Sequence, residues 1–197
     1  MSVTAQSVEQ AAERLAGVVI ETPLQFNQRL SAATGAQVWL KREDLQPVRS
    51  YKLRGAYNLI AQLSDAERAA GVACASAGNH GQGVAYACAR LGIRAQIFVP
   101  STTPRQKRQR MRQLGEGWAE LIVHGDTYDD AAALAHEVVA SEGRTLVPAF
   151  DDERTIAGQG TVAAEIVAQL GRAPDTRIVP VGGGGMIAGC MTWLAER

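Results

Sequence analysis

Residues 72–99 read VACASAGNHGQGVAYACARLGIRAQIFV. Residues 72–75 and residues 95–99 are short apolar runs, and between them residues 79–91 have apolar positions at helical spacing that stop at Gly92. A strand, a helix and a second strand in this order predict a βαβ unit, in which a helix connects two parallel strands and covers one face of them.

Short strands and helices of ten to fifteen residues alternate along most of the chain. The remaining strands are expected at residues 38–40, 121–123, 145–147 and 177–181. The remaining helices are expected at residues 7–18, 51–63, 104–114, 128–141 and 156–170, and from residue 186 onward. Ser7 and Gln10 have the spacing of a capping box, so the first helix is expected to begin at Ser7. The alternation is typical of α/β proteins with parallel sheets flanked by helices.

The composition argues against several classes of partner. The chain carries 20 basic and 20 acidic side chains, and this balance gives no support for a nucleic-acid or anionic-membrane partner, because both favour a basic surface. No apolar run reaches the roughly 18 residues that a membrane-spanning helix needs, and the first ten residues lack the pattern of a secretory signal. We therefore expect no nucleic-acid partner, no membrane partner and a cytoplasmic location.

The three cysteines are Cys74, Cys88 and Cys190. Their spacing matches no zinc site, and an odd number fits a disulfide framework poorly. Each lies among small apolar residues, so we expect buried thiols in a reducing cytosol and no metal site.

Four consecutive glycines, Gly182 to Gly185, follow the strand expected at residues 177–181 and precede the last helix. Glycines let the backbone approach an anion closely, and the helix that follows supplies free N–H groups and the positive end of its dipole. The run lacks the Lys–Ser/Thr pair of a nucleotide-binding P-loop and the spacing of a dinucleotide loop. It therefore indicates a site for a phosphate monoester, and the alternative is a tight turn without a ligand.

A second loop of this kind follows the strand expected at residues 72–75. Residues 76–83 read SAGNHGQG, and they would lie at the carboxyl end of a parallel strand, where open α/β sheets bind their ligands. Ser76 and Asn79 add short polar side chains that suit a carboxylate or a ring hydroxyl. The alternative is an ordinary helix cap, and His80 is interpreted as a supporting group rather than a catalytic base.

Lys52 lies at the start of the helix expected at residues 51–63, in an apolar and basic setting. Burial of the amine and the nearby cations Arg49 and Arg54 would lower the pKa of Lys52 and make it a better nucleophile. A solvated surface lysine is the other interpretation, and the residue alone does not decide between the two.

Together these segments resemble those of the fold-type II pyridoxal-phosphate enzymes, the tryptophan synthase β-like family, and in particular the biosynthetic threonine dehydratases (threonine ammonia-lyases). The resemblance extends from about Thr22 to Arg197. It rests on residues 41–58, KREDLQPVRSYKLRGAYN; residues 76–80, SAGNH; residues 150–161, FDDERTIAGQGT; and residues 181–185, VGGGG. Two departures are Tyr51 and Gly81, which stand where the family usually has Phe and Ala.

The resemblance implies a pyridoxal 5'-phosphate cofactor and assigns roles to matching residues. Lys52 would be the catalytic residue, carrying the cofactor as a Schiff base and removing the α-proton of the substrate. Asn79 would bind the ring hydroxyl of the cofactor. Its phosphate would be held by the backbone N–H groups of Gly182, Gly183, Gly184, Gly185 and Met186. The substrate carboxylate would be received by Ser76, Gly78, Asn79 and His80.

The resemblance also implies a fold of two lobes. Residues 1–70 and 149–197 would form a large cofactor-binding lobe and residues 71–148 a small mobile lobe. Few strands are left to flank a parallel strand at residues 177–181, and no hydroxyl or thiol residue matches the family's partner of the pyridine nitrogen. We therefore expect the C-terminal part of the large lobe to lie outside this chain, as in a fragment that is inactive on its own.

The implied activity is that of a lyase, which deaminates L-threonine to 2-oxobutanoate and ammonia in the first step of isoleucine biosynthesis, a branched-chain amino-acid pathway. A serine racemase or serine dehydratase of the same fold is the nearest alternative. A non-catalytic fragment is the alternative from a different class. The expected partners are a small amino-acid substrate and, in a full-length enzyme, further copies of the chain in a dimer or tetramer.

Overall fold

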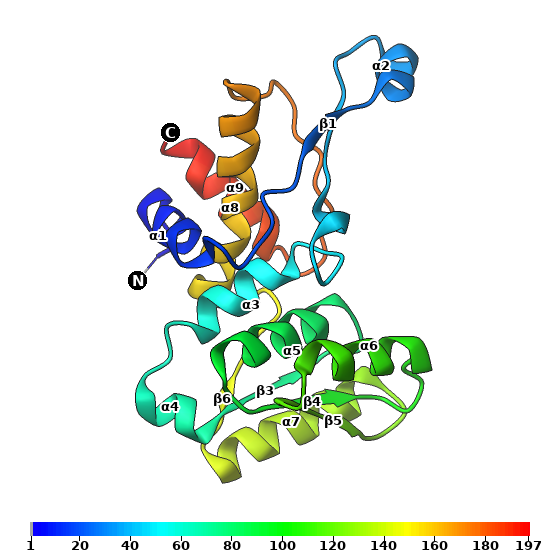
Figure 1. The fold of residues 1–197 in the computed structure, drawn as a ribbon, viewed down its shortest axis with the longest axis vertical. Helices are drawn as coiled ribbons and strands as arrows, with labels where there is room; N and C mark the ends of the chain where they lie inside the picture. Colours follow the sequence, from blue (N-terminus) through cyan, green and yellow to red (C-terminus); the bar gives the residue numbers. More distant parts are fainter. Residues whose placement is uncertain (1) are drawn as a thin grey trace.

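A parallel sheet of four strands forms the middle of the chain in the computed structural model, which describes residues 2–197 (Figure 1). The strands lie in the order β5, β4, β3, β6, and every neighbouring pair is parallel. They span Ala119–Val123, Ala95–Val99, Val72–Ala75 and Thr145–Leu146, respectively. The βαβ unit that residues 72–99 predict is confirmed, and so are the parallel sheet and the α/β class.

Helices cover both faces of this sheet (Figure 1). Successive side chains of a strand point to opposite faces, and β3 shows the consequence. Cys74 lies in the core cluster that α5 (Asn79–Leu91) and α6 (Arg105–Gly115) help to form, whereas Ala73 lies in a second cluster under α7 (Tyr128–Glu142). The cysteines are free and buried, as the sequence predicts.

Helix α8 (Glu153–Leu170) organises the rest of the chain. It packs against α1 (Ala5–Leu15), α3 (Lys52–Ile60) and α9 (Gly185–Ala195). Helix α3 in turn packs against α5, so that α3 lies between α8 and the helices of the parallel sheet (Figure 1). The start of α3 is therefore fixed by contacts on two sides.

Two glycines allow α8 to approach its neighbours closely. A Cβ atom on Gly158 would lie 2.6 Å from the carbonyl oxygen of Arg54 in α3, which is closer than a real Cβ atom comes to another heavy atom. A Cβ atom on Gly189 of α9 would overlap the carbonyl oxygen of Ile156 in α8. Both crossings thus bring helix backbones into direct contact, and a larger residue at either position would force the helices apart.

A two-stranded antiparallel sheet projects from this helical part (Figure 1). Its second strand, β2 (Trp39–Lys41), agrees within one residue with the strand expected at residues 38–40. The rings of Phe26 and Trp39 meet edge to face with their centroids 5.2 Å apart. Four elements were not predicted: β1 (Leu24–Phe26), α2 (Gln28–Thr34), η1 (Glu43–Leu45) and α4 (Asp65–Ala70).

Two local predictions are wrong. Residues 177–181 form no strand: Ile178 is 95% exposed, and no strand of residues 2–197 pairs with this segment. A sequence of high strand propensity does not form a strand without a neighbour to accept its backbone hydrogen bonds. The first helix begins at Ala5 rather than Ser7, because Thr4 is the N-cap residue and Ser7 completes its capping box.

The crossing of α3 and α8 makes a stability prediction. Replacing Gly158 with Ala should lower the free energy of unfolding by about 1–3 kcal/mol, because the added methyl group meets backbone that has no room to move. Gly182→Ala is the matched control, since its Cβ would meet no heavy atom within 4 Å. Urea unfolding should show little change for the control, and equal midpoints for the two variants would contradict the close crossing.

Candidate active site

Lys52 is the first residue of α3 and is half-buried. Its Nζ donates a hydrogen bond of 2.7 Å to the carbonyl oxygen of Ala149 and lies 5.4 Å from the centroid of the Tyr51 ring. Burial lowers the pKa of the Lys52 amine from its ordinary value, which is the expected direction. The expected contributions of Arg49 and Arg54 to this pKa shift do not arise, because burial accounts for it. The charge of Arg54 is matched by carboxylates on the other side of α3.

The segment formed by residues 147–150 connects three helix starts. Ala149 accepts the hydrogen bond from Lys52 at the start of α3. Val147 places its carbonyl oxygen 2.8 Å from Nε2 of His80, in the first turn of α5. Phe150 lies against the glycine run before α9, where a Cβ atom on Gly183 would overlap its ring. One short segment therefore brings together the three sequence motifs that were predicted to form a site.

A second contact joins Lys52's neighbour to the glycine run. Tyr51 and Met186 both pack against the apolar cluster of Val162, Ala163 and Cys190, between α8 and α9. Helix α9 begins at Gly185, after Gly184 in the left-handed conformation with φ of 87°. The residue before the amine and the residue after the glycines are thus held by the same part of α8.

His80 is buried in the first turn of α5. The side chain is 3% exposed, and because a carbonyl oxygen only accepts, its Nε2 carries the proton that it shares with Val147. Burial, together with the charge of Lys52, lowers the pKa of His80 to about 4, although the bond to Val147 opposes this. A neutral imidazole turned away from solvent agrees with the interpretation of His80 as a supporting group.

The helices that begin at the site lack side-chain caps. The N-cap residues of α5 and α9 are Gly78 and Gly184, and no side chain accepts a hydrogen bond from the first N–H groups of either helix. Five other helices have such caps, supplied by Thr4, Asn27, Ser64, Thr127 and Asp152. Uncapped helix starts leave N–H groups and the positive end of the dipole available to an anionic ligand.

The remaining predicted residues are exposed or make only local contacts. Asn79 is exposed, and Ser76 is half-buried and accepts a hydrogen bond of 3.3 Å from the N–H of Gly78. Gly182 and Gly183 are exposed. The hydrogen bonds of Lys52 go to Ser50 and Ala149 and not to Ser76 or Asn79, so the roles of these two residues stay predictions.

A small cavity of about 150 Å³ adjoins this arrangement. Ala75 at the carboxyl end of β3 lines it together with Ala149 and Phe150, and α7 contributes Tyr128 and His136. Parallel α/β sheets bind ligands at the carboxyl ends of their strands. The sequence did not single out residues 147–150, because the atoms that act there are backbone carbonyls, which any residue type supplies.

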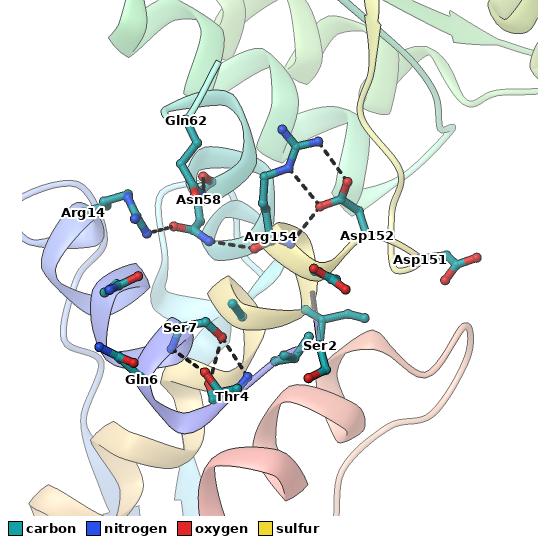
Figure 2. A pocket seen from close by; sticks show the side chains of 15 residues that line it. Ser2, Thr4, Gln6, Ser7, Arg14, Asn58, Gln62, Asp151, Asp152 and Arg154 are labelled. Atoms are coloured by element: carbon teal, nitrogen blue, oxygen red, sulfur yellow. Dashed lines mark hydrogen bonds and ion pairs between the residues drawn. The ribbon is translucent and has the colours of Figure 1, made fainter. Parts of the chain in front are cut away.

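A larger open cleft of about 1040 Å³ lies elsewhere, between α1 and the start of α8 (Figure 2). Arg14 donates a hydrogen bond of 3.2 Å to the side chain of Asn58, which donates one of 2.7 Å to the carbonyl oxygen of Arg154. Asp152 caps α8 and pairs with Arg154. None of the predicted site residues lines this cleft, whose polar groups largely satisfy one another, so it is separate from the candidate site.

The family model described as pyridoxal-phosphate dependent enzyme matches residues 15–197. The chain belongs to this family. It is 62% identical over 196 residues to the biosynthetic L-threonine dehydratase IlvA of Mycobacterium tuberculosis, covering 100% of this chain and 46% of the relative. It is 50% identical to the corresponding Bacillus subtilis protein over 93% of this chain and 44% of that one. The chain spans about half the length of the curated relatives it matches.

Solved structures agree with this assignment. The processed form of threonine deaminase isoform 2 from Solanum lycopersicum superposes with a TM-score of 0.89 at 40% identity, over all of this chain and 55% of that one. Maize serine racemase superposes with a TM-score of 0.92 at 31% identity, over 98% of this chain and 57% of that one. The fold is that of the fold-type II pyridoxal-phosphate enzymes.

The residues present fit the family's cofactor. Lys52 offers an amine whose pKa is lowered by burial, as bonding to an aldehyde at neutral pH requires. The glycine run has no side chains and precedes a helix without a side-chain cap. A Cβ atom built on Gly182 would meet no heavy atom within 4 Å, so there is open space beside this backbone for a ligand. Among residues 2–197, no cluster of three or more potential metal ligands occurs, and no helix is long and apolar enough to cross a membrane.

The neutral, buried His80 makes a pH prediction. Its pKa falls from 6.5 in the unfolded chain to about 4 in the folded one, so the unfolded state binds more protons between these values. The contribution of His80 to stability is complete above pH 6.5 and is lost as the pH falls toward 4. The loss should approach about 3 kcal/mol.

The matched variant is His80→Gln, whose amide can still donate to Val147 but does not titrate. Paired carboxylates such as Glu43 and Asp152 titrate equally in both proteins, so the difference between the two stability curves isolates the imidazole. Urea unfolding at pH values from 4 to 8 measures it. Parallel curves for wild type and variant would show that His80 is not held neutral.

Proposed function

We propose that a protein containing this chain deaminates L-threonine to 2-oxobutanoate and ammonia in the cytoplasm. The observation that carries the proposal is the 147–150 segment, which joins the Lys52 amine, the start of α5 and the glycine run. Identity of 62% to biosynthetic threonine dehydratases supports this substrate over other amino acids. Isoleucine biosynthesis is then the pathway that the product enters.

The proposed cofactor contacts are those that the family resemblance assigns, and the uncapped starts of α5 and α9 support them. Lys52 binds the cofactor through its amine, and Asn79 donates to the ring hydroxyl. The backbone N–H groups of residues 182–186 hold the phosphate, because the start of α9 has no side-chain cap to compete with it. The start of α5 is open in the same way and receives the substrate carboxylate through residues 76–80.

When bound, pyridoxal phosphate supplies an electron sink that makes the α-proton of an amino acid acidic. The protein's part is to hold and move protons. Nζ of Lys52 accepts the α-proton, which its burial-lowered pKa favours because a larger fraction of the amine is unprotonated at neutral pH. The carbonyl oxygen of Ala149 orients that amine through its 2.7 Å hydrogen bond. Neutral His80 adds no competing positive charge beside it.

The proposal includes an organisation into lobes and an assembly. Residues 1–70 and 149–197 form the large lobe and residues 71–148 the small one, with the 147–150 segment at the boundary. The strands of the parallel sheet and the helices α5, α6 and α7 that cover it lie within residues 72–146, which supports the division. The full-length enzyme assembles as a homo-oligomer, a dimer or tetramer.

The alternative activity is that of a serine racemase or serine dehydratase. The superposition on maize serine racemase supports this alternative. Substrate preference separates the two. We expect 2-oxobutanoate from L-threonine to exceed pyruvate from L-serine, and no D-serine to form. Preferential turnover of serine, or D-serine formation, would replace the proposed activity with the rival one, and no turnover of either substrate would favour the non-catalytic alternative.

The Schiff-base role of Lys52 is testable on the chain itself, which has only three lysines, Lys41, Lys52 and Lys107. Lys107 is exposed on α6, whereas Lys41 is ion-paired with Glu165. Adding pyridoxal phosphate and then borohydride should fix the cofactor mainly at Lys52. Peptide mass mapping measures the ratio of label at Lys52 to label at Lys107.

The control for this labelling is Lys52→Ala, which should lose the visible absorbance band of the bound cofactor while keeping the label at Lys107. Lys52→Ala should also abolish threonine turnover in a protein that contains the chain. A band that survives in Lys52→Ala, or equal labelling of Lys52 and Lys107 in the wild type, would show that another residue binds the cofactor.

A further inference from the structure

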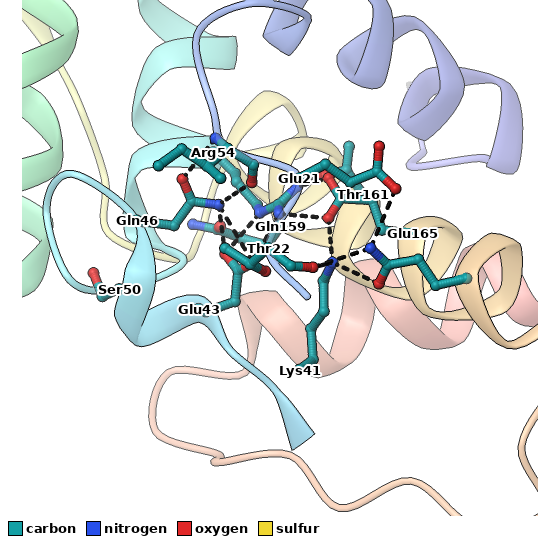
Figure 3. Close-up of polar contacts among 12 residues, drawn as sticks. Glu21, Thr22, Lys41, Glu43, Gln46, Ser50, Arg54, Gln159, Thr161 and Glu165 are labelled. Carbon is teal, nitrogen blue, oxygen red and sulfur yellow. Dashed lines mark hydrogen bonds and ion pairs between the residues drawn. The ribbon is translucent and has the colours of Figure 1, made fainter. Parts of the chain in front are cut away.

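Arg54 lies two residues after Lys52 and is completely buried. All five of its N–H donors are used. Nε and Nη2 donate to the two oxygens of Glu43, each at 2.8 Å, and Nη1 and Nη2 donate to those of Glu165, at 2.6 and 2.9 Å (Figure 3). The fifth bond, from Nη1 to Oγ1 of Thr161, measures 3.0 Å. A planar guanidinium is the one side chain that can make this double fork.

These partners come from separate parts of the chain. Glu43 belongs to η1, and Glu165 and Thr161 belong to α8. Lys41 completes the set by pairing with Glu165 at 2.5 Å. We call Lys41, Glu43, Arg54, Thr161 and Glu165 the Arg54 network. Two positive and two negative charges balance within it, and its bonds join α3 to η1 and α8 (Figure 3).

The charges within the Arg54 network shift the pKa of Glu43. Burial alone would raise the pKa of Glu43, but the bonds from Arg54 hold it below its ordinary value. Thr22 and Gln46 add hydrogen bonds to Glu43 of 2.7 and 3.4 Å. Glu43 therefore favours the ionised form that pairs with Arg54, and Glu165 binds the guanidinium from α8.

Lys52 and Arg54 point to nearly opposite sides of α3. Successive residues of an α-helix are turned by about 100°, so residues two apart differ by about 200°. Lys52 reaches Ala149 on one side while Arg54 reaches η1 and α8 on the other. The side chain of Tyr51, the N-cap residue of α3, gives the helix start no cap. The bonds of Arg54 are therefore a directional reference for the rotation of this first turn.

We infer that Arg54 is a positioning residue for Lys52: through the Arg54 network it fixes the rotation of the first turn of α3 and so holds Nζ of Lys52 at Ala149. The inference rests on the proposed function only in taking Lys52 as the residue that binds the cofactor. Arg54 itself is buried. Its side-chain hydrogen bonds go to η1 and α8 rather than to the glycine run or the 147–150 segment.

The decisive variant is Arg54→Lys, which keeps the charge but cannot donate to both carboxylates in a fork. Glu165→Gln is a milder second variant, which removes one charge and leaves the bonds to Glu43 in place. Phe98→Leu is the control, because Phe98 is buried in the cluster under α7 and not in the cluster that contains α3. Its loss of thermal stability provides the comparison for an effect on folding alone.

Trace acetylation with acetic anhydride reports the setting of each lysine without any cofactor. The groups recorded beside the Lys52 amine are the Tyr51 ring and the imidazole of His80. In the wild type, the pH midpoint for acetylating Lys52 should lie below that for exposed Lys107. In Arg54→Lys it should move toward that of Lys107, with a smaller move in Glu165→Gln and none in Phe98→Leu. An unchanged midpoint in Arg54→Lys would overturn the inference.

Trapping of pyridoxal phosphate with borohydride then separates the inference from the proposed function. The ratio of label at Lys52 to label at Lys107 should fall about tenfold in Arg54→Lys, because displacing a reactive group by about 1 Å costs a large part of its rate. Failure of the wild type to label Lys52 would end the proposed function, while the acetylation midpoints would still decide the role of Arg54. Equal losses in Arg54→Lys and Phe98→Leu would reduce Arg54 to a purely structural residue.

Discussion

The close crossing of α8 with two other helices sets the distances on which the candidate site depends. Gly158 admits the backbone of α3, and Gly189 of α9 admits the backbone of α8. Helix α3 begins with Lys52 and α9 begins at Gly185, the last residue of the glycine run, so α8 fixes the separation between the Lys52 amine and these glycines. Because backbone contacts are stiffer than contacts between side chains, this separation tolerates little change.

The 147–150 segment is the second element that positions the candidate site. Carbonyl oxygens from two of its residues bind Lys52 and His80, and the ring of its last residue lies against Gly183. The segment runs from β6 to the start of α8, so it belongs to the connection between the parallel sheet and the helical part. Any relative movement of these two parts would be transmitted directly to the Lys52 amine through its bond to Ala149.

The sequence predicted the elements of the site better than the contacts among them. The βαβ pattern, the parallel sheet and the helix beginning near Lys52 follow from periodicity and helix-end signals. The carbonyl of Ala149 could not be found in this way, because backbone atoms leave no signature in residue type. Arg54 was expected to act on Lys52 through its charge, yet its partner Glu165 lies 111 residues further along the chain. The prediction of a strand at residues 177–181 was wrong because strand propensity alone does not provide a neighbouring strand to pair with.

The composition of the Arg54 network is difficult to explain by stability alone. Removing one member of a buried ion pair costs about 3–5 kcal/mol, yet replacing a whole network by apolar residues of similar volume is often neutral or stabilising. Apolar packing is not directional, so a leucine in the place of Arg54 would tolerate rotation of α3 about its axis. Two forked ion pairs are directional and fit only one rotation of α3. A helix that presents a reactive amine on one side gains from such a reference on the other, since a small rotation would carry Nζ of Lys52 away from Ala149.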